Sequence, residues 1–126
     1  EECVSGVESA ISATKKHGVK TAFAPDMLFD PEVAAKEGKF LAKLQKWYTP
    51  AEVLKMATHD NAELIKMCGP REPYPGALGV VKEGALADLI LVDGNPIENL
   101  DLVADPEKNF VIIMKDGVIY KNTLTK

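Results

Sequence analysis

The sequence has little of the residues that mark several common classes of protein. Its 126 residues include two cysteines, Cys3 and Cys68, and two histidines, which are too few for a disulfide framework or a zinc knuckle. Neither cysteine has a histidine near it in the sequence, so a catalytic thiol has no support. The apolar stretches, such as residues 111–114, are far shorter than the roughly 20 residues of a membrane-spanning helix. We therefore expect no membrane contact.

A basic surface is also missing. The chain has 15 Lys and Arg against 19 Asp and Glu, a formal net charge of -4, and its basic residues form no stripe. Phosphate backbones are bound by clustered Lys and Arg, so we expect no nucleic-acid partner. The acidic start, Glu1 and Glu2, predicts no signal peptide on this chain. The sequence indicates no cellular compartment.

The remaining composition is that of a folded domain. Hydrophobic residues make up 46% of the chain and charged residues 27%, which is enough apolar material for a core. The length corresponds to one domain. Because a (β/α)8 barrel takes about 250 residues, any resemblance to a barrel enzyme must be to part of one.

The first part of the chain predicts a helix followed by a strand. Val4, Val7 and Ile11 recur at helical spacing, and Gly18 follows a basic last turn, as at many helix ends. The next residues, 19–24, suit a short buried strand. This alternation of helix and strand is typical of a βα fold.

Two more helix starts are visible in the sequence. Asp30 is suited to cap a helix that runs as far as Trp47, in which Gly38 is a weak point. Thr49 and Glu52 have the spacing of a capping box, in which each side chain accepts a hydrogen bond from the other residue's backbone N–H. They predict a new helix that begins at this point.

The chain changes character near residue 70. Residues 58–61 are polar and favour caps, so they predict that the third helix breaks and restarts before it ends at Gly69 and Pro70. After this point the chain predicts a small β unit, with one strand over residues 87–92. Residues 110–115 and 118–121 are joined by Asp-Gly, which predicts a type I′ hairpin.

An ordered series of short motifs resembles a known family. The series comprises Thr49-Pro50-Ala51-Glu52, Ala57-Thr58, Asn61-Ala62, Leu78-Gly79, Glu83-Gly84, Ala87-Asp88-Leu89, Asp93-Gly94-Asn95-Pro96 and Lys115-Asp116-Gly117. In this order and spacing it resembles the C-terminal end of the metal-dependent amidohydrolase superfamily, especially its imidazolonepropionase-like and prolidase-like members. No single motif is specific, but the ordered series is, and the match extends from Val19 onward.

The resemblance implies an α/β fold. Residues 1–69 would be the last βα portion of a (β/α)8 amidohydrolase barrel, with residues 19–24 as its eighth strand. Residues 70–126 would be the C-terminal strands of a small composite β-sandwich, whose other strands come from the N-terminus of the family's proteins. The chain is then expected to be the C-terminal part of a barrel-sized enzyme.

The same resemblance implies a role for Asp26. It lies two residues past the predicted strand, where barrel enzymes place their catalytic groups. In the family, a carboxylate at this place binds a divalent metal and accepts a proton from the metal-bound water. Taken without the family, Asp26 would more simply cap a turn. The family commonly has Gly-Thr or Gly-Ser before this Asp, whereas Ala24 and Pro25 stand here, and proline fixes φ and removes an N–H.

The remaining candidate site residues are expected to have structural roles. His17 suits the end of a helix, and His59 a partly exposed break. Since the family's metal sites need imidazoles from other strands, including a His-x-His pair that this chain lacks, we expect a divalent metal, most simply zinc, in full-length relatives and none in this chain. Asp88 is expected to bind backbone N–H groups. The aromatic residues Phe40, Trp47 and Tyr48 are expected in the core rather than in a pocket.

Three kinds of function are compatible with these observations. The first is the C-terminal part of a hydrolase acting on amide, cyclic amide or dipeptide bonds, inactive by itself and taking a small amide or dipeptide substrate in the complete enzyme. The second is a non-catalytic α+β module that associates with itself. A dedicated binding module would need a binding signature, which the sequence does not contain. Unpaired strand edges lead us to expect a homo-oligomer.

Overall fold

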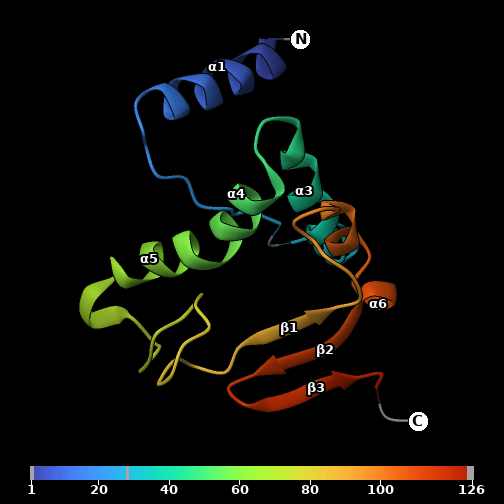
Figure 1. The fold of residues 1–126 in the computed structure, drawn as a ribbon. Coiled ribbons are helices and arrows are strands. Elements are labelled where there is room, and N and C mark those ends of the chain that lie inside the picture. The colour runs from blue at the N-terminus through green and yellow to red at the C-terminus, as the bar shows by residue number, and fades with distance from the viewer. Residues whose placement is uncertain (1, 28, 125–126) are drawn as a thin grey trace.

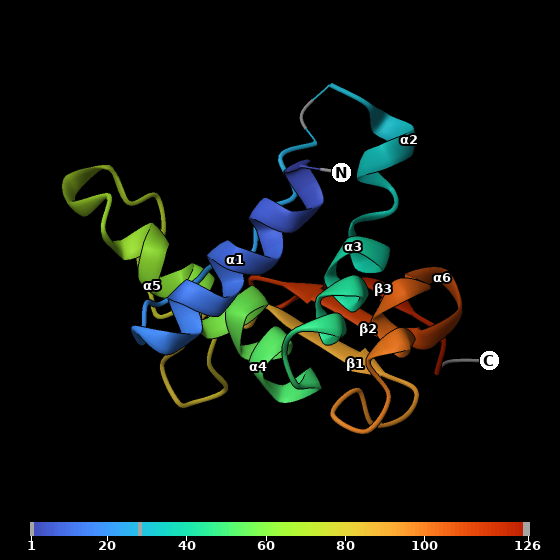
Figure 2. The same cartoon turned by 90° about the horizontal axis from the view of Figure 1, so that it is seen from above.

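The computed structural model describes residues 2–27 and 29–124, and it places the helices on one side of a small sheet (Figures 1 and 2). The helical part consists of α1 (Glu2–Lys16), α2 (Pro31–Ala34), α3 (Glu37–Lys43), the 3₁₀ turn η1 (Leu44–Lys46), α4 (Pro50–Lys55), the π-helical turn η2 (Met56–Asp60), α5 (Asn61–Lys66) and the 3₁₀ turn η3 (Gly69–Arg71). No helix of the described residues is long and apolar enough to cross a membrane.

The sheet is antiparallel, with the order β1-β2-β3. Its strands are β1 (Leu89–Val92), β2 (Phe110–Lys115) and β3 (Val118–Asn122), and the 3₁₀ turn η4 (Leu100–Ala104) and α6 (Pro106–Asn109) connect β1 to β2. The predicted hairpin is confirmed: Asp116 and Gly117 both have positive φ, 49° and 76°, as a type I′ turn requires.

Both predicted helix caps are also present. The Asp30 carboxylate accepts hydrogen bonds from the backbone N–H groups of Glu32 and Val33, each at 3.0 Å. At the start of α4, the Thr49 N–H donates to Glu52 Oε2 at 2.7 Å and the Glu52 N–H donates to Thr49 Oγ1 at 3.3 Å. These reciprocal bonds satisfy N–H groups that the first turn leaves without helical partners.

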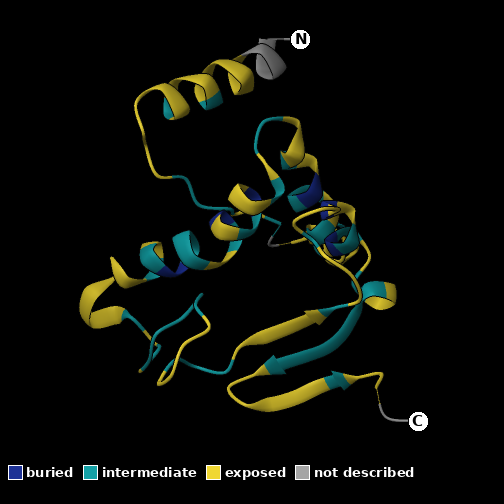
Figure 3. Ribbon diagram, viewed as in Figure 1, coloured by how far each residue is buried: buried dark blue, intermediate teal, exposed yellow. Residues whose placement is uncertain are grey.

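The core lies among α3, α4 and η4 (Figure 3). It consists of Ala42, Val53, Leu100 and Val103, so residues before and after position 70 share one apolar cluster. Gly38 permits this packing, because a Cβ at Gly38 would lie 2.1 Å from the carbonyl oxygen of Val103. The glycine that weakens α3 as a helix is therefore the one that lets α3 approach η4.

The strand predicted for residues 19–24 is wrong for this chain. The segment is not part of the described sheet, and the reason is that a strand needs a neighbour to complete its hydrogen bonds. The segment finds a side-chain partner instead, as described below. The strand predicted for residues 87–92 is shorter in the structure, because β1 begins at Leu89. The side chain of the preceding residue, Asp88, accepts a hydrogen bond from the backbone of Asp116 in the hairpin turn.

Two helix predictions also need correction. The helix expected from Asp30 to Trp47 is divided into α2, α3 and η1. The break expected at residues 58–61 does not occur, because the chain passes from α4 to α5 through η2 without leaving the helical region. The wider π-helical turn accommodates the polar residues that the prediction assigned to a gap.

Polar contacts tie the first helix to the rest of the chain. Lys46 Nζ lies 2.8 Å from Glu8 Oε1, and Lys15 donates to the carbonyl of Trp47 and lies 4.3 Å above the Tyr48 ring. Val7 is exposed, and Ile11 is half-buried. The helix that the apolar spacing predicted is present, but its described residues bury little apolar surface.

Candidate functional site

Asp26 is exposed and has a left-handed backbone conformation, with φ of 51°. Aspartate tolerates this conformation better than most residues. It follows the extended segment 19–25, whose residues Phe23 and Pro25 line a groove between the helices and the sheet. The predicted catalytic residue is therefore exposed and follows a lining residue, but is not itself part of the lining.

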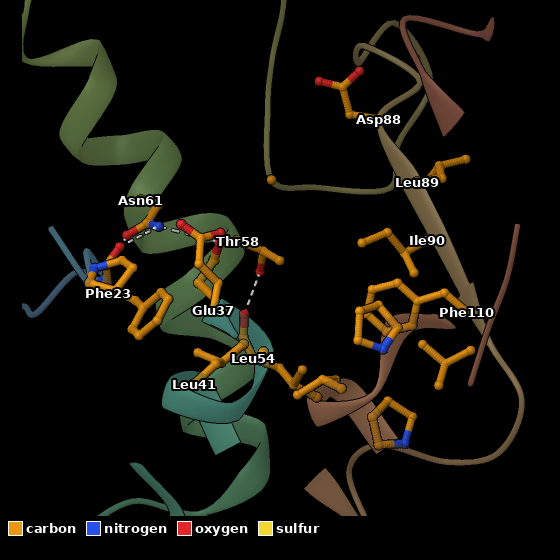
Figure 4. A pocket seen from close by; sticks show the side chains of 18 of the residues that line it. Phe23, Glu37, Leu41, Leu54, Thr58, Asn61, Asp88, Leu89, Ile90 and Phe110 are labelled. Carbon is orange, nitrogen blue, oxygen red and sulfur yellow. Dashed lines mark hydrogen bonds between the residues drawn. The ribbon is translucent and has the colours of Figure 1, made fainter. Parts of the chain in front are cut away.

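The extended segment is held by one side chain of α5. The Phe23 N–H donates to Asn61 Oδ1 at 2.8 Å, and Asn61 Nδ2 donates back to the Phe23 carbonyl at 2.9 Å (Figure 4). Asn61 Nδ2 also lies 3.4 Å from the Ala57 carbonyl. The amide thus gives Phe23 the same pair of bonds that a neighbouring strand would provide.

The groove has a volume of about 850 Å³. Helical residues such as Leu41, Leu54 and Thr58 line one side, and Ile90 and Phe110 of the sheet line the other (Figure 4). Most of these side chains are apolar, and Asn61 is one of the few polar groups among them. Concave apolar surfaces with a few polar groups are typical of ligand sites and of surfaces that another segment covers.

Three motif residues meet where the helix widens. Thr58 Oγ1 donates to the Leu54 carbonyl at 2.7 Å, and Gly79 packs on the backbone of Thr58, where a Cβ would lie 2.5 Å from the carbonyl oxygen. Asn61 is on the following turn. The separate motifs around Thr58, Asn61 and Gly79 therefore form one structural unit, which lines part of the groove.

The histidines do not join Asp26. His59 Nδ1 lies 3.1 Å from Asp60 Oδ1 on the same helix, and His17 is exposed just after α1. Hydrogen bonds from Lys55, and secondarily from His59, hold the pKa of the Asp60 carboxyl below its ordinary value. This cluster is a charged helix surface.

The described residues do not form a metal site by themselves. They contain no group of three or more His, Cys, Asp or Glu side chains that could hold an ion. A zinc or similar site needs three protein ligands and an open position, and Asp26 supplies one carboxylate. The residues present therefore do not fit a complete metal centre.

Asp88 has the structural role that the sequence predicted. Its Oδ1 accepts a hydrogen bond from the Asp116 N–H at 2.7 Å, and its Oδ2 lies 3.5 Å from Lys115 Nζ. The Gly117 N–H donates to the Ala87 carbonyl at 3.1 Å. The motifs at 87–89 and 115–117 thus lock the hairpin turn to the start of β1.

The other candidates lie apart from the groove. Cys68 is exposed, and the lining of the groove does not include Phe40, Trp47 or Tyr48. Tyr48 packs against the core, while Lys43 and Lys46 lie above the rings of the other two at 4.7 and 4.9 Å. The core position expected for the three aromatic residues is therefore found for Tyr48, whereas Phe40 and Trp47 are half-buried and outside the core cluster.

Sequence reasoning missed the function of Asn61. It appeared as part of a motif and as a polar residue at a helix break. The available signal was an asparagine inside a helical stretch, where it is a poor helix former that competes with the backbone for hydrogen bonds. Such a residue is expected to hydrogen-bond to a group outside its own helical turn, and in this chain that group is the backbone of Phe23.

Comparisons with known proteins agree with this architecture. The Amidohydrolase family matches residues 2–122. A solved amidohydrolase is 32% identical with a TM-score of 0.77, over 92% of this chain and 26% of that chain. A prolidase complexed with N-methylphosphonate-L-proline is 30% identical with a TM-score of 0.76, over 91% and 26%. Ochratoxinase of A. niger is 26% identical with a TM-score of 0.68, over 90% and 24%.

No curated protein matches the chain. The chain spans about a quarter of the length of the solved structures it resembles. Within that quarter, the similarity covers both the helical segment and the three-stranded sheet, including the unit of Thr58, Asn61 and Gly79 and the motifs at residues 87–89 and 115–117. The match over residues 2–122, together with these structures, shows that the chain belongs to the amidohydrolase family.

Proposed function

We propose that this chain forms the C-terminal part of a metal-dependent amidohydrolase, and that Asp26 is its catalytic and metal-binding carboxylate. Family membership indicates hydrolysis of carbon–nitrogen bonds. The substrate class is a small amide, cyclic amide or dipeptide. The observation that carries the proposal is the family match over nearly the whole chain, which includes Asp26.

The position of Asp26 supports this assignment. It is the first acidic residue after segment 19–25, it is exposed, and its backbone has a positive φ of 51°. An exposed carboxylate is accessible to groups from another part of a protein. In the proposed enzyme, imidazoles that this chain does not contain would complete the site.

The isolated chain is therefore expected to be inactive. A panel of amides and dipeptides with zinc, manganese or cobalt should show no hydrolysis by the purified chain. Turnover that disappears in Asp26→Asn would contradict this expectation and would show that one chain, or an assembly of copies, builds a working site.

A chimaera tests the catalytic assignment itself. The matching quarter of the 30% identical prolidase would be replaced by this chain, and hydrolysis of a dipeptide that the prolidase cleaves would be measured. We expect activity in the chimaera and a fall in kcat of about 10² to 10⁴ in Asp26→Asn, the range for loss of an acid–base group. Asp30→Asn is the matched control, because asparagine caps a helix as well as aspartate does. An active chimaera that is indifferent to Asp26→Asn would refute the assignment.

A second candidate function, self-association, is favoured by the edge of the sheet. The edge strand β3 exposes Val118, Ile119 and Tyr120 in succession, with 56%, 49% and 71% of each residue accessible. Exposed apolar edges are templates for pairing with another strand. We propose that a second copy pairs its β3 with this one across a two-fold axis, because an antiparallel pair of identical strands satisfies that symmetry.

Light scattering at micromolar concentration measures the association directly. We expect a dimer or larger oligomer, and we expect Val118→Lys to shift it toward monomer, since charges on edge strands oppose pairing. Phe29→Lys is the matched control, because Phe29 is 96% exposed and distant in sequence from β3. A wild-type monomer of 13.7 kDa would exclude this function.

A further inference from the structure

We propose that Asn61 is the positioning residue for Asp26: it fixes the backbone of Phe23, and two conformationally restricted residues transmit that constraint to the carboxylate. This inference rests on the proposed function of Asp26. It assigns to α5 a role in the site that neither the motif series nor the family match specifies.

The Asn61 side chain binds both backbone polar groups of Phe23, and this pair of hydrogen bonds is called the clamp below. The Asn61 amide accepts from the Phe23 N–H and donates to the Phe23 carbonyl, at 2.8 and 2.9 Å. Two bonds to the same residue define its position and also its orientation about the chain axis, which one bond would leave free to rotate. The planar side-chain amide of Asn carries a donor and an acceptor side by side, which suits this pair of bonds.

The clamp is anchored on a rigid part of the molecule. Ala62, the next residue of α5, is buried, and Met56 in the preceding turn is buried too. Asn61 and Phe23 both line the groove and are half-buried, where competition from water is reduced and hydrogen bonds are stronger than at an open surface. The segment 19–25, which has no partner in the described sheet, is thus tied to the helix layer at Phe23.

The path from Phe23 to Asp26 consists of two residues, Ala24 and Pro25. The ring of Pro25 locks its φ near -65°. The residue before a proline is confined to extended conformations, so Ala24 is restricted as well. The φ of Pro25 and both torsions of Ala24 are therefore restricted, which narrows the backbone paths between Phe23 and Asp26, and the proline that departs from the family pattern makes the link stiffer.

Two substitutions separate the clamp from the link. Asn61→Asp preserves the shape and the acceptor but replaces the donor with an oxygen that repels the Phe23 carbonyl. Pro25→Ala leaves the clamp in place and loosens the link. Asn99→Asp is the matched control, because Asn99 acts only as an acceptor, from the Asp101 N–H at 3.1 Å.

The readouts are amide hydrogen exchange and ¹³C chemical shifts of the 126-residue chain by NMR, and neither requires activity. In Asn61→Asp, we expect exchange at Phe23 to accelerate about tenfold or more, and the Cα and Cβ shifts of Asp26 to move from left-handed to averaged values. In Pro25→Ala, we expect the Asp26 shifts to move while Phe23 stays protected. Asn99→Asp should change neither readout.

The proposal is overturned if Asn61→Asp leaves the Asp26 shifts unchanged. It is also overturned if exchange rises equally in α4, or if the variant unfolds, because Asn61 would then act on overall stability. The chimaera keeps the two proposals distinct. If Asp26→Asn leaves it active while the NMR result is as expected, the proposed function fails and the clamp remains a structural device.

Discussion

Gly38→Ala tests whether the approach of α3 to η4 holds the chain together. The substitution adds one methyl group in the first turn of α3, and in a helix interior alanine is favoured over glycine by about 1 kcal/mol, which is the upper limit of the gain expected here. Helix propensity alone therefore predicts a more stable protein. The structure predicts the opposite, because the new Cβ would lie 2.1 Å from the Val103 carbonyl oxygen and 3.1 Å from its carbon.

The size of the effect follows from what must move. The atoms that the methyl meets belong to the backbone of η4, so no side-chain rotation relieves the overlap, and α3 must shift by about an ångström from the buried Leu100 and Val103. Overpacking of this kind costs about 1 to 3 kcal/mol, and a rigid backbone neighbour favours the upper value. After a gain of up to about 1 kcal/mol in propensity, the expected net loss is about 2 kcal/mol.

Urea denaturation followed by circular dichroism measures the difference in unfolding free energy. Gly6→Ala is the matched control, because Gly6 lies in α1 with nothing within 4 Å of the added Cβ, and it should be neutral or stabilising. A Gly38→Ala variant as stable as the wild type would refute the close packing of α3 on η4.

Three further predictions concern local structure. Gly117→Val should destabilise the chain by about 1 kcal/mol or more, because a β-branched residue is strained at a φ of 76°; an unchanged denaturation midpoint would argue against the type I′ turn. Thr49→Ala should cost about 1 kcal/mol through loss of the cap, whereas Thr49→Ser should restore most of it. Hydrogen bonds from Thr49, the backbone one first, lower the pKa of Glu52 from its ordinary value of 4.5. The stability that the ionised Glu52 contributes is therefore present above about pH 4.5 and is lost as the pH falls through the lowered pKa of the folded state. Glu52→Gln should flatten the dependence of unfolding free energy on pH in this range, and an unaltered dependence would contradict the capping box.

Local signals predicted the caps and the hairpin well. Asp30, the Thr49–Glu52 pair and Asp116-Gly117 act through neighbours in the sequence, and the structure has each of them as expected. The family resemblance was likewise readable from ordered motifs, and it is confirmed. The caps and the turn could be predicted because the interacting residues lie within three positions of one another, and the family because its motifs recur in a fixed order.

Two of the errors arose where the partner is distant in sequence. Residues 19–24 have the composition of a strand, but a strand forms only where a neighbouring strand can pair with it. Here the hydrogen bonds to Phe23 come from the side chain of Asn61, 38 residues away in the sequence. Gly38 appeared as a weak point because its reason, the backbone of Val103, is also remote. The role of Asp26 stays a prediction, since the groups that would complete its site are not among the described residues.

The distribution of buried residues explains why self-association and completion by another part of an enzyme both arise for this chain. The buried apolar residues are Ala42, Val53, Met56, Ala62, Leu100 and Val103, and all lie in the helices and in η4. In the sheet, Leu89 pairs with Met114 and Leu91 with Ile112, on the face opposite to that of Ile90, which points toward the groove (Figure 4). Leu89, Ile90 and Leu91 remain 39%, 54% and 48% exposed, so the described residues leave both faces of β1 partly open. Sheets with one solvated face normally alternate apolar and polar residues, and β1 does not. A strand that is apolar on both faces is suited to a position between two layers, and the described helices cover only part of one face.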